Sequence, residues 1–363
     1  MEKKLAIIAV IVVAIVVVGA VAITVMPGGD DDSKTIYWST VAPVNQKAAI
    51  ANGTISAGVS WEPYVSDSIL AGSGSALIWS GDIWSGHPCC VLAVDTDYAE
   101  DNPEAVATYI AALIVATEWL TDTIENPESE NYSLLLEIGA QFSGRSEEVV
   151  NASLAHIKYD TLIDEATLSW FVNYTESYQE LDLFTTSLSA RGYDNATDFV
   201  DQLVNQTYYE MAIELLESNP TETYNIRVGY LAGDLHQFAR VVASNATVGN
   251  GTTIFEQFGI TVTSPNLAGY PSGGDVMDAF AGNYIDIGYL GAPPTLLKAI
   301  NANVDVTIVA LVNTEGSAIV VGDGISSFED LAGKTVGVPG PSSIQYLLLL
   351  YYADQQGYNV VAA

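Results

Sequence analysis

Apolar positions along the chain follow two spacings, one typical of strands and one typical of helices. Short apolar runs predict buried strands at residues 35–39, 55–60, 76–80, 89–95, 226–230, 285–290, 306–312, 317–321 and 335–338. Over residues 102–217 apolar residues recur instead at helical spacing, as at Val106, Tyr109, Ile110 and Leu113. The pattern predicts an α/β fold in which a helical segment interrupts the strands.

Residues 272–294 contain the clearest unit of this pattern. A glycine turn precedes a short amphipathic helix whose apolar face carries Val276, Ala279 and Phe280, and a strand follows at residues 285–290. The strand ends in a Gly-Ala-Pro-Pro corner. Because α/β folds place ligands in loops at strand ends, this corner is a candidate binding loop.

The same unit occurs a second time, near the N-terminus. Aligning Ala279 with Ala49 also aligns four more identical residues, which are Ala281, Ile285, Gly288 and Pro293 with Ala51, Ile55, Gly58 and Pro63. Two further segments, starting at Ile226 and Lys334, both read as a strand ending in Val-Gly, a Gly/Pro loop and a helix. The sequence therefore predicts two related lobes. The second lobe is split between the two ends of the chain, as in a circular permutation.

Read in the order 226–363 and then 34–218, the sequence resembles the substrate-binding proteins of ABC importers of the nitrate/sulfonate/taurine type. The segments that carry the resemblance are IRVGYLAGDLHQFA, SGGDVMDAFAGNYIDIGYLGAPPTLLKAI, NTEGSAIVV, FEDLAGKTVGVPGPSSIQ, GVSWEPYVS and SGDIWSGHPCCVL. The resemblance implies a two-lobe, periplasmic-binding-protein-like (type II) fold in permuted order. It also implies that the chain crosses between the lobes at residues 81–88 and 313–316.

On this interpretation the chain has four parts. Residues 1–33 form a signal or transmembrane anchor with a linker. Residues 34–218 supply strands of the second lobe and the helices that, in the family, brace the two lobes. Residues 226–325 form the first lobe, and residues 326–363 begin the second lobe, with a capping box expected at Ser326 and Glu329. An excerpt of a tandem array would give the same order of segments.

The first residues of the chain predict a membrane segment. Lys3 and Lys4 precede an apolar run over residues 5–25, which is long enough to cross a bilayer and would place the rest of the chain outside the cytoplasm. A cleavable signal peptide is the alternative, because Ala20-Val21-Ala22 has the form of a cleavage site. The length of the run favours a retained anchor.

Charge and sequon content agree with an extracytoplasmic protein that does not bind nucleic acid. The formal net charge is −33, from 44 acidic and 11 basic residues, whereas nucleic-acid phosphates require Lys and Arg. Such an acidic surface is typical of salty habitats. Eight Asn-x-Ser/Thr sequons predict a surface open to glycosylation. They begin at Asn52, Asn131, Asn151, Asn173, Asn195, Asn205, Asn245 and Asn250.

The sequence contains no catalytic motif and implies no cofactor. GxSxG, HExxH and Walker patterns are absent from it, and the three histidines follow no metal spacing. The two cysteines, Cys89 and Cys90, are adjacent, and burial in an apolar strand is the favoured interpretation of the pair. Metal ligation is a minor alternative, because His87 is the nearby soft partner in the sequence.

The two-lobe interpretation brings five loops and one facing segment to the cleft. The candidate ligand-binding residues are Asp234, His236, Gly273, Gly274, Asp275, Gly291, Ala292, Pro293, Asn313, Thr314, Gly340, Ser342 and Ser343, with Trp61 and Glu62 on the opposing lobe. The loop at residues 340–343 would offer a helix N-terminus to an oxyanion; alternatively, Ser342 only caps that helix. Trp61 would stack on the ligand or lie in the core, and Glu62 would pair with an ammonium group.

These features predict a membrane-tethered solute-binding protein that closes on a small organic anion, such as a sulfonate, taurine or nitrate, and presents it to an ABC permease and its ATPase. It would not be an enzyme. A ligand-sensing ectodomain is one alternative. The other is a protein that binds a thiamine-pyrimidine precursor, because pyrimidine-synthesising proteins of thiamine biosynthesis share the fold that the resemblance implies but carry a denser cysteine cluster.

Overall fold

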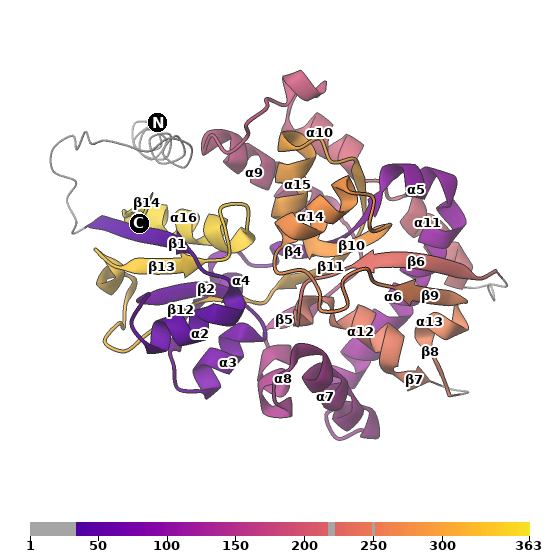
Figure 1. Cartoon of the computed structure of the whole chain (residues 1–363), viewed down its shortest axis with the longest axis horizontal. Helices are drawn as coiled ribbons and strands as arrows, with labels where there is room; N and C mark the ends of the chain where they lie inside the picture. The colour runs from indigo at the N-terminus through magenta and orange to yellow at the C-terminus, as the bar shows by residue number, and fades with distance from the viewer. Residues whose placement is uncertain (1–33, 217–221, 249–250) are drawn as a thin grey trace.

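The computed structural model describes residues 34–216, 222–248 and 251–363, whose longer strands form two six-stranded sheets. The apolar segment at residues 5–25 lies outside these residues. The first sheet has the order β14 (Asn359–Ala362), β1 (Thr35–Thr40), β13 (Thr335–Val338), β2 (Ala57–Trp61), β12 (Ser317–Val321) and β3 (Ser75–Trp79). We call this sheet and its helices the terminal lobe; it lies at the left of Figure 1, in indigo and yellow.

The second sheet lies beside the first and has the order β5 (Ile157–Tyr159), β11 (Val306–Glu315), β4 (Pro88–Asp95), β10 (Ile287–Gly291), β6 (Tyr224–Gly229) and β9 (Ile260–Thr263). We call this sheet and its helices the central lobe (Figure 1). A hairpin of β7 (Thr247–Val248) and β8 (Thr252–Thr253) lies at its edge. Two sheets with helices around them agree with the predicted two-lobe α/β fold.

The terminal lobe is built from both ends of the described chain. Strand β1 pairs in parallel with β13, where Trp38 lies opposite Val336, and also with β14, where Ile36 lies opposite Val360. Strand β13 in turn pairs in parallel with β2. The helices of this lobe are α2 (Pro43–Ala51), α3 (Tyr64–Leu70), η5 (Phe328–Leu331) and α16 (Ile344–Gln356). The pairing agrees with a split lobe, while the permuted order relative to the family stays a prediction.

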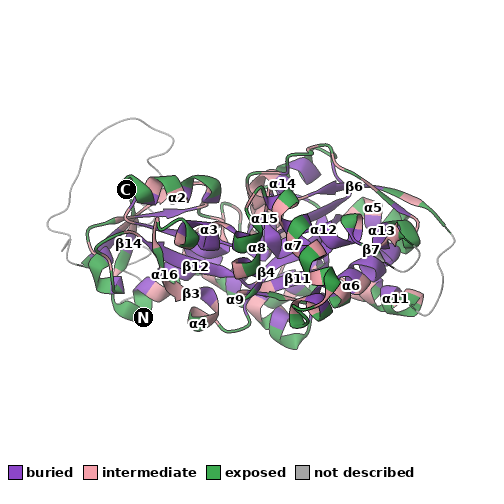
Figure 2. Ribbon diagram, turned by 90° about the horizontal axis from the view of Figure 1, so that it is seen from below, coloured by how far each residue is buried: buried purple, intermediate pink, exposed green. Residues whose placement is uncertain are grey.

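The central lobe carries the helical segment that apolar spacing predicts. Its helices are α5 (Thr96–Asp101), α6 (Pro103–Glu125), α7 (Glu130–Ser143), α8 (Glu147–Leu154), α9 (Glu165–Glu180), η3 (Ser189–Arg191), α10 (Ala196–Leu203), α11 (Thr207–Leu216), η4 (Leu235–Gln237), α12 (Phe238–Asn245), α13 (Ile254–Gln257), α14 (Gly273–Ala281) and α15 (Ala292–Asn301). Among the described helices, α6 alone is long and apolar enough to cross a membrane, but 72% of its most apolar window is buried inside the molecule. This burial identifies α6 as a core helix (Figure 2).

The chain crosses between the lobes at the two segments that the resemblance implies. Strand β3 leads through α4 (Ser80–Ile83) into β4, and β11 leads into β12 through Gly316. Gly316 has a φ of 83°, a conformation that glycine adopts at little cost. Helix α16 also connects the lobes, because Tyr346 and Leu349 pack in the core of the terminal lobe whereas Leu347 and Leu348 pack in that of the central lobe.

Two helix starts differ from the prediction by one residue. The capping box begins at Ser327 and is closed by Asp330, rather than by Ser326 and Glu329. Asp330 also accepts a hydrogen bond from the backbone N–H of Ser326, so the same carboxylate holds the whole turn. Helix α16 is capped by Ser343, whose hydroxyl accepts a hydrogen bond from the N–H of Tyr346, and not by Ser342.

Candidate ligand-binding cavity

A cavity of about 270 Å³ lies between the two lobes, and both lobes line it. From the terminal lobe come Thr40, Trp61, Pro339, Gly340, Pro341, Ser342, Ser343, Ile344 and Gln345. The central lobe contributes Cys89, Cys90, Leu231, Asp234, His236, Ser272, Gly273, Gly274, Gly291 and Pro294. Strands β1, β2 and β10 end at this cavity, and the loop after β13 borders it. The cavity thus occupies the position that α/β folds use for ligands, at the carboxyl ends of the strands.

Three helix N-termini meet at the cavity. Gly273 and Gly274 are the first residues of α14, Gly291 precedes α15, and Ser343 precedes α16. Backbone N–H groups in the first turn of a helix have no partner within the helix, and the helix dipole adds a partial positive charge there. The N-termini of α14 and α16 therefore offer N–H donors to an anion, whereas that of α15 adds little, because Pro293 and Pro294 in its first turn carry no N–H.

Trp61 adds an unpartnered hydrogen-bond donor. Its side chain lines the cavity and is 7% exposed, at the end of β2. The indole Nε1 has no hydrogen-bond partner among the residues that the structure describes. A buried N–H without an acceptor costs about 1–3 kcal/mol, so a ligand oxygen placed against it would recover that free energy.

Asp234 and His236 form a buried charged pair in the wall of the central lobe. The carboxylate of Asp234 accepts a hydrogen bond of 2.9 Å from the backbone N–H of His236, and the two side chains approach to 3.8 Å. Burial raises the pKa of Asp234 to about 6. Burial alone would lower the pKa of His236, but the neighbouring Cys89 thiolate and Asp234 outweigh it and raise the pKa to about 9.

Cys89 and Cys90 line the cavity beside His236, although 147 and 146 positions of the sequence separate them from this histidine. Their Sγ atoms lie 3.3 Å and 4.0 Å from Nδ1 of His236. A hydrogen bond from the Cys90 thiol lowers the pKa of Cys89 well below its usual value. Sequence neighbourhood suggested His87 as the soft partner of these cysteines, but the fold brings His236 to them instead. The prediction that both cysteines are buried agrees with the structure.

Nine of the predicted ligand-binding residues share this cavity, and six do not line it. Glu62 is fully buried behind it and accepts hydrogen bonds from Ser66 and Ser153, so its position gives no support to a role as partner of a ligand ammonium group. Asp275 is turned back to Ser272. The remaining four also lie outside the lining: Ala292 and Pro293 inside the start of α15, and Asn313 and Thr314 in the strand that crosses between the lobes.

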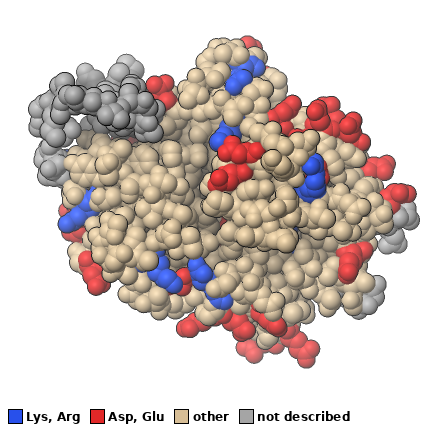
Figure 3. Space-filling view, viewed as in Figure 1, with Lys and Arg blue, Asp and Glu red and all other residues tan. Residues whose placement is uncertain are grey.

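The cavity also contains residues that loop positions did not predict. Thr40 is the carboxyl end of β1, where the rule for α/β folds places ligands. Cys89 and Cys90 lie instead at the start of β4, which reaches the cavity because β4 runs antiparallel to β10 and Cys90 lies opposite Gly291. Among the described lining residues none is Lys or Arg, and His236 is the one that carries a positive charge at neutral pH. An anion would therefore be held chiefly by N–H donors. The surface around the lobes is acidic, as Figure 3 shows for one face.

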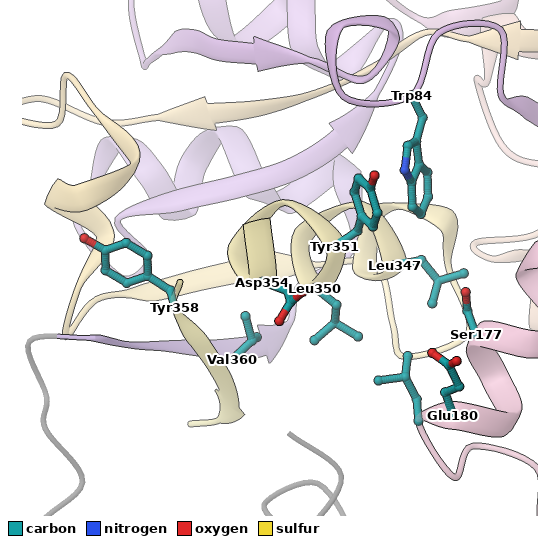
Figure 4. Close-up of a pocket in the computed structure, with 10 residues that line it drawn as sticks. Trp84, Ser177, Glu180, Leu347, Leu350, Tyr351, Asp354, Tyr358 and Val360 are labelled. Carbon is teal, nitrogen blue, oxygen red and sulfur yellow. The ribbon is translucent and has the colours of Figure 1, made fainter. Parts of the chain in front are cut away.

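A second cavity, of about 180 Å³, lies between α9 and α16. Figure 4 shows its lining, in which Trp84 faces Tyr351, their ring centroids 4.6 Å apart. Glu180 and Asp354 also line it, and none of the predicted ligand-binding residues does. Carboxylates and aromatic rings favour a cation over an anion, which separates this cavity chemically from the one between the lobes.

Comparisons with known proteins agree with a binding protein of this class. The model of the NMT1-like family matches residues 23–133. The chain is 22% identical over 189 residues to the nitrate/nitrite binding protein NrtA of Nostoc sp., which covers 50% of this chain and 42% of that protein. It is 25% identical over 223 residues to the protein of the same name from Synechocystis sp., covering 54% and 49%. The chain thus spans somewhat less than half the length of these relatives.

No solved structure matches the chain. Both relatives are named as binding proteins rather than as enzymes. The similarities therefore support a solute-binding protein of the nitrate/sulfonate/taurine type, in agreement with the two-lobe α/β architecture and its interlobe cavity.

Proposed function

We propose that this protein is the solute-binding component of an ABC importer and that it binds a small oxyanion in the cavity between its lobes. The proposal rests on the buried, unpartnered N–H of Trp61, which lies in the same cavity as the first turns of α14 and α16. An oxyanion has several acceptor oxygens and so can satisfy donors from opposite walls at once. Hydrogen bonds in which the acceptor is ionised are roughly twice as strong as neutral ones.

The size and charge of the cavity narrow the class of ligand. Sites for drug-sized molecules usually measure about 300–1,000 Å³, and this cavity is below that range at about 270 Å³. Nitrate, nitrite and short sulfonates or carboxylates are candidates of suitable size. A zwitterion such as taurine would place its sulfonate at the helix N-termini and its ammonium group near Asp234, the carboxylate that lines the cavity.

Ligand capture would proceed by closure of the lobes about the two crossing segments. The ligand would contact Trp61 on one lobe and Gly273 and Gly274 on the other, so it would favour the closed form over the open form. The closed protein would then deliver the anion to a permease. The same closure in a sensing ectodomain would signal instead, and a neighbouring permease gene distinguishes the two.

We further propose that the units of the family occur here in permuted order. The pairing of β1 with both β13 and β14 supports this proposal, because the strands at the two ends of the described chain become neighbours. A reordered chain that runs from Glu222 to Ala363, through a Gly/Ser linker, and then from Lys34 to Leu216 should fold and bind the same anion. A reordered chain that fails to fold while the natural order folds would count against the proposal.

The membrane attachment is a proposal based on the sequence. Residues 5–25 would anchor the protein and place the lobes outside the cytoplasm. Six sequon asparagines within the described residues are exposed and Asn205 is half-buried, which suits an extracytoplasmic surface. Protease added to intact cells should digest the lobes; full protection would contradict this location.

Binding is tested directly by a thermal-shift screen of the purified chain. The panel contains nitrate, nitrite, bicarbonate, taurine, alkyl sulfonates, short carboxylates and aminopyrimidines, with choline as a cationic control. A ligand at 100 times its dissociation constant stabilises the folded state by about 2.7 kcal/mol. Stabilisation by oxyanions supports the proposal, whereas stabilisation by aminopyrimidines alone would replace it by binding of a thiamine-pyrimidine precursor.

A further inference from the structure

Three soft donor atoms meet in the wall of the cavity. The Sγ atoms of Cys89 and Cys90 and Nδ1 of His236 all lie within 4.8 Å of one another, and all three residues are buried. In a tetrahedral zinc site, bonds of about 2.3 Å to sulfur and 2.0–2.1 Å to nitrogen place sulfur and nitrogen about 3.6 Å apart. The observed separations from Nδ1, 3.3 Å and 4.0 Å, lie on either side of this value.

The hydrogen bonding of His236 leaves Nδ1 able to bind a metal. Nε2 lies 3.1 Å from the carbonyl oxygen of Gly316, and because a carbonyl only accepts, Nε2 carries the proton. Loss of the second ring proton, which lies on Nδ1, then leaves a lone pair that faces the two sulfurs. Metal-binding histidines typically donate their second N–H to a carbonyl or carboxylate in this way. Gly316 permits the approach, because a Cβ at this position would collide with Nε2.

An irregularity in the central sheet directs both thiols to the same place. Successive residues of a regular strand point to opposite faces, so adjacent cysteines would not normally share a partner. The pairing of β4 with β11 is irregular at this point. Cys90 lies opposite Asn313, but Pro88, two residues earlier in β4, lies opposite the next residue of β11, Thr314. Asn313 fixes this bulge by accepting a hydrogen bond of 3.1 Å from the backbone N–H of Cys90. Bulges often re-aim side chains at functional sites.

We propose that Cys89, Cys90 and His236 bind a thiophilic divalent metal ion of the zinc class. Two thiolates and one imidazole are a donor set that suits zinc, and they leave a fourth position open towards the cavity for water or a ligand oxygen. Metal binding releases two protons to solvent, one from the Cys90 thiol and one from Nδ1 of the His236 imidazolium, while Cys89 binds as the thiolate. No electron is transferred. The site does not depend on which anion the cavity binds.

Cobalt binding to the full chain tests the site. The protein is reduced, stripped of metal with a chelator and titrated with Co²⁺ under anaerobic conditions. Because the chain contains two cysteines in all, any sulfur-to-cobalt charge-transfer absorption reports Cys89 and Cys90. The expected result is such an absorption at one Co²⁺ per chain, displaced by one equivalent of Zn²⁺. A folded, reduced protein that shows no charge-transfer absorption and retains no metal would overturn the proposal.

Variants separate this site from metal bound at the acidic surface. Cys89→Ser together with Cys90→Ser should abolish the absorption and the retention of zinc. His156→Gln, which alters a histidine that stacks on Trp79 outside the cluster, should retain both. Circular dichroism checks that each variant is folded. If the cysteine variant does not fold, the Co²⁺ titration of the wild-type protein alone decides whether the metal site exists. Stoichiometric zinc that survives removal of both thiols would show that the ion binds elsewhere and would also overturn the proposal.

Discussion

The hydroxyl of Tyr64 donates a hydrogen bond of 2.9 Å to the carbonyl oxygen of Ala232. Tyr64 begins α3 of the terminal lobe, and Ala232 follows β6 of the central lobe, so this bond joins the two lobes. Burial raises the pKa of Tyr64 to about 12, which keeps the hydroxyl protonated as a donor. The bond therefore stabilises the arrangement in which the cavity lies between two walls.

Replacing Tyr64 by Phe should weaken anion binding without removing any lining residue. A single neutral hydrogen bond contributes about 0.5–1.5 kcal/mol, so the dissociation constant should rise by about 2- to 10-fold. Calorimetric titration measures this change. Tyr132→Phe is the matched control, because Tyr132 bonds to Asn151 within the helical part of the central lobe. Equal effects of the two substitutions would show that the bond between the lobes does not govern binding.

Replacing Trp61 by Phe should remove the donor that the ligand is proposed to satisfy. Hydrogen bonds to charged groups contribute about 1.5–3 kcal/mol, so affinity for the anion should fall by about 10- to 100-fold. Without ligand the two effects on stability oppose each other, because the variant loses the packing of one ring but also the cost of the unpartnered N–H. Trp38→Phe is the control, since Trp38 packs on Tyr346, with their ring centroids 4.7 Å apart, and does not line the cavity.

Two neighbouring glycines at the start of α14 should respond differently to alanine. A Cβ on Gly273 would lie 2.6 Å from Cγ of Pro294, whereas the nearest atom to a Cβ on Gly274 lies at 3.5 Å. Gly273→Ala should therefore cost about 1–3 kcal/mol in the free energy of unfolding. Gly274→Ala should change stability by less than about 1 kcal/mol, with a gain from helix propensity. Urea denaturation measures both, and equal destabilisation would contradict the close contact with Pro294.

The segment at which β11 crosses into the terminal lobe should give a pH-dependent contribution to stability. Burial alone would raise the pKa of Glu315, but hydrogen bonds from Lys158 and from the backbone N–H of Gly86 outweigh it and lower the pKa. The folded state therefore binds this proton less tightly than the unfolded state. The stabilisation is present above the usual pKa of Glu and is lost as the pH falls through the lowered value.

Glu315→Gln tests this contribution. The variant should be less stable than the wild type at pH 7, and the difference should shrink as the pH falls below about 4. Urea denaturation at a series of pH values gives the comparison. A difference that is independent of pH would mean that Glu315 acts through its shape rather than through its charge.

Local sequence patterns predicted much of the frame around the cavity. The glycine turn, helix and strand of residues 272–294 appear as α14 and β10, and both crossing segments lie where the resemblance implies. These features depend on turn residues and apolar spacing within short segments, which the sequence displays directly. Short strands such as β5 and β9 were not predicted, because a few residues carry too little periodicity and their pairing is decided by the sheet.

The sequence did not predict contacts between distant segments. Cys89 and His236 meet although they are 147 positions apart, and the bulge opposite Asn313 directs the thiols. Glu62 follows Trp61 directly, but the chain turns there, so one side chain lines the cavity and the other bonds to Ser66 and Ser153. Such side-chain directions depend on the whole fold, and adjacency in the sequence does not reveal them.

Anion binding between the lobes is measured by calorimetric titration of the purified chain with nitrate, nitrite, taurine and an alkyl sulfonate. We expect saturable binding of at least one of these anions at one site per chain, weakened about 10- to 100-fold by Trp61→Phe and unchanged by Trp38→Phe. Absence of binding by a folded protein to every anion of the panel would contradict this expectation. So would an affinity that the Trp61 substitution leaves unchanged, because the anion would then lie outside the cavity between the lobes.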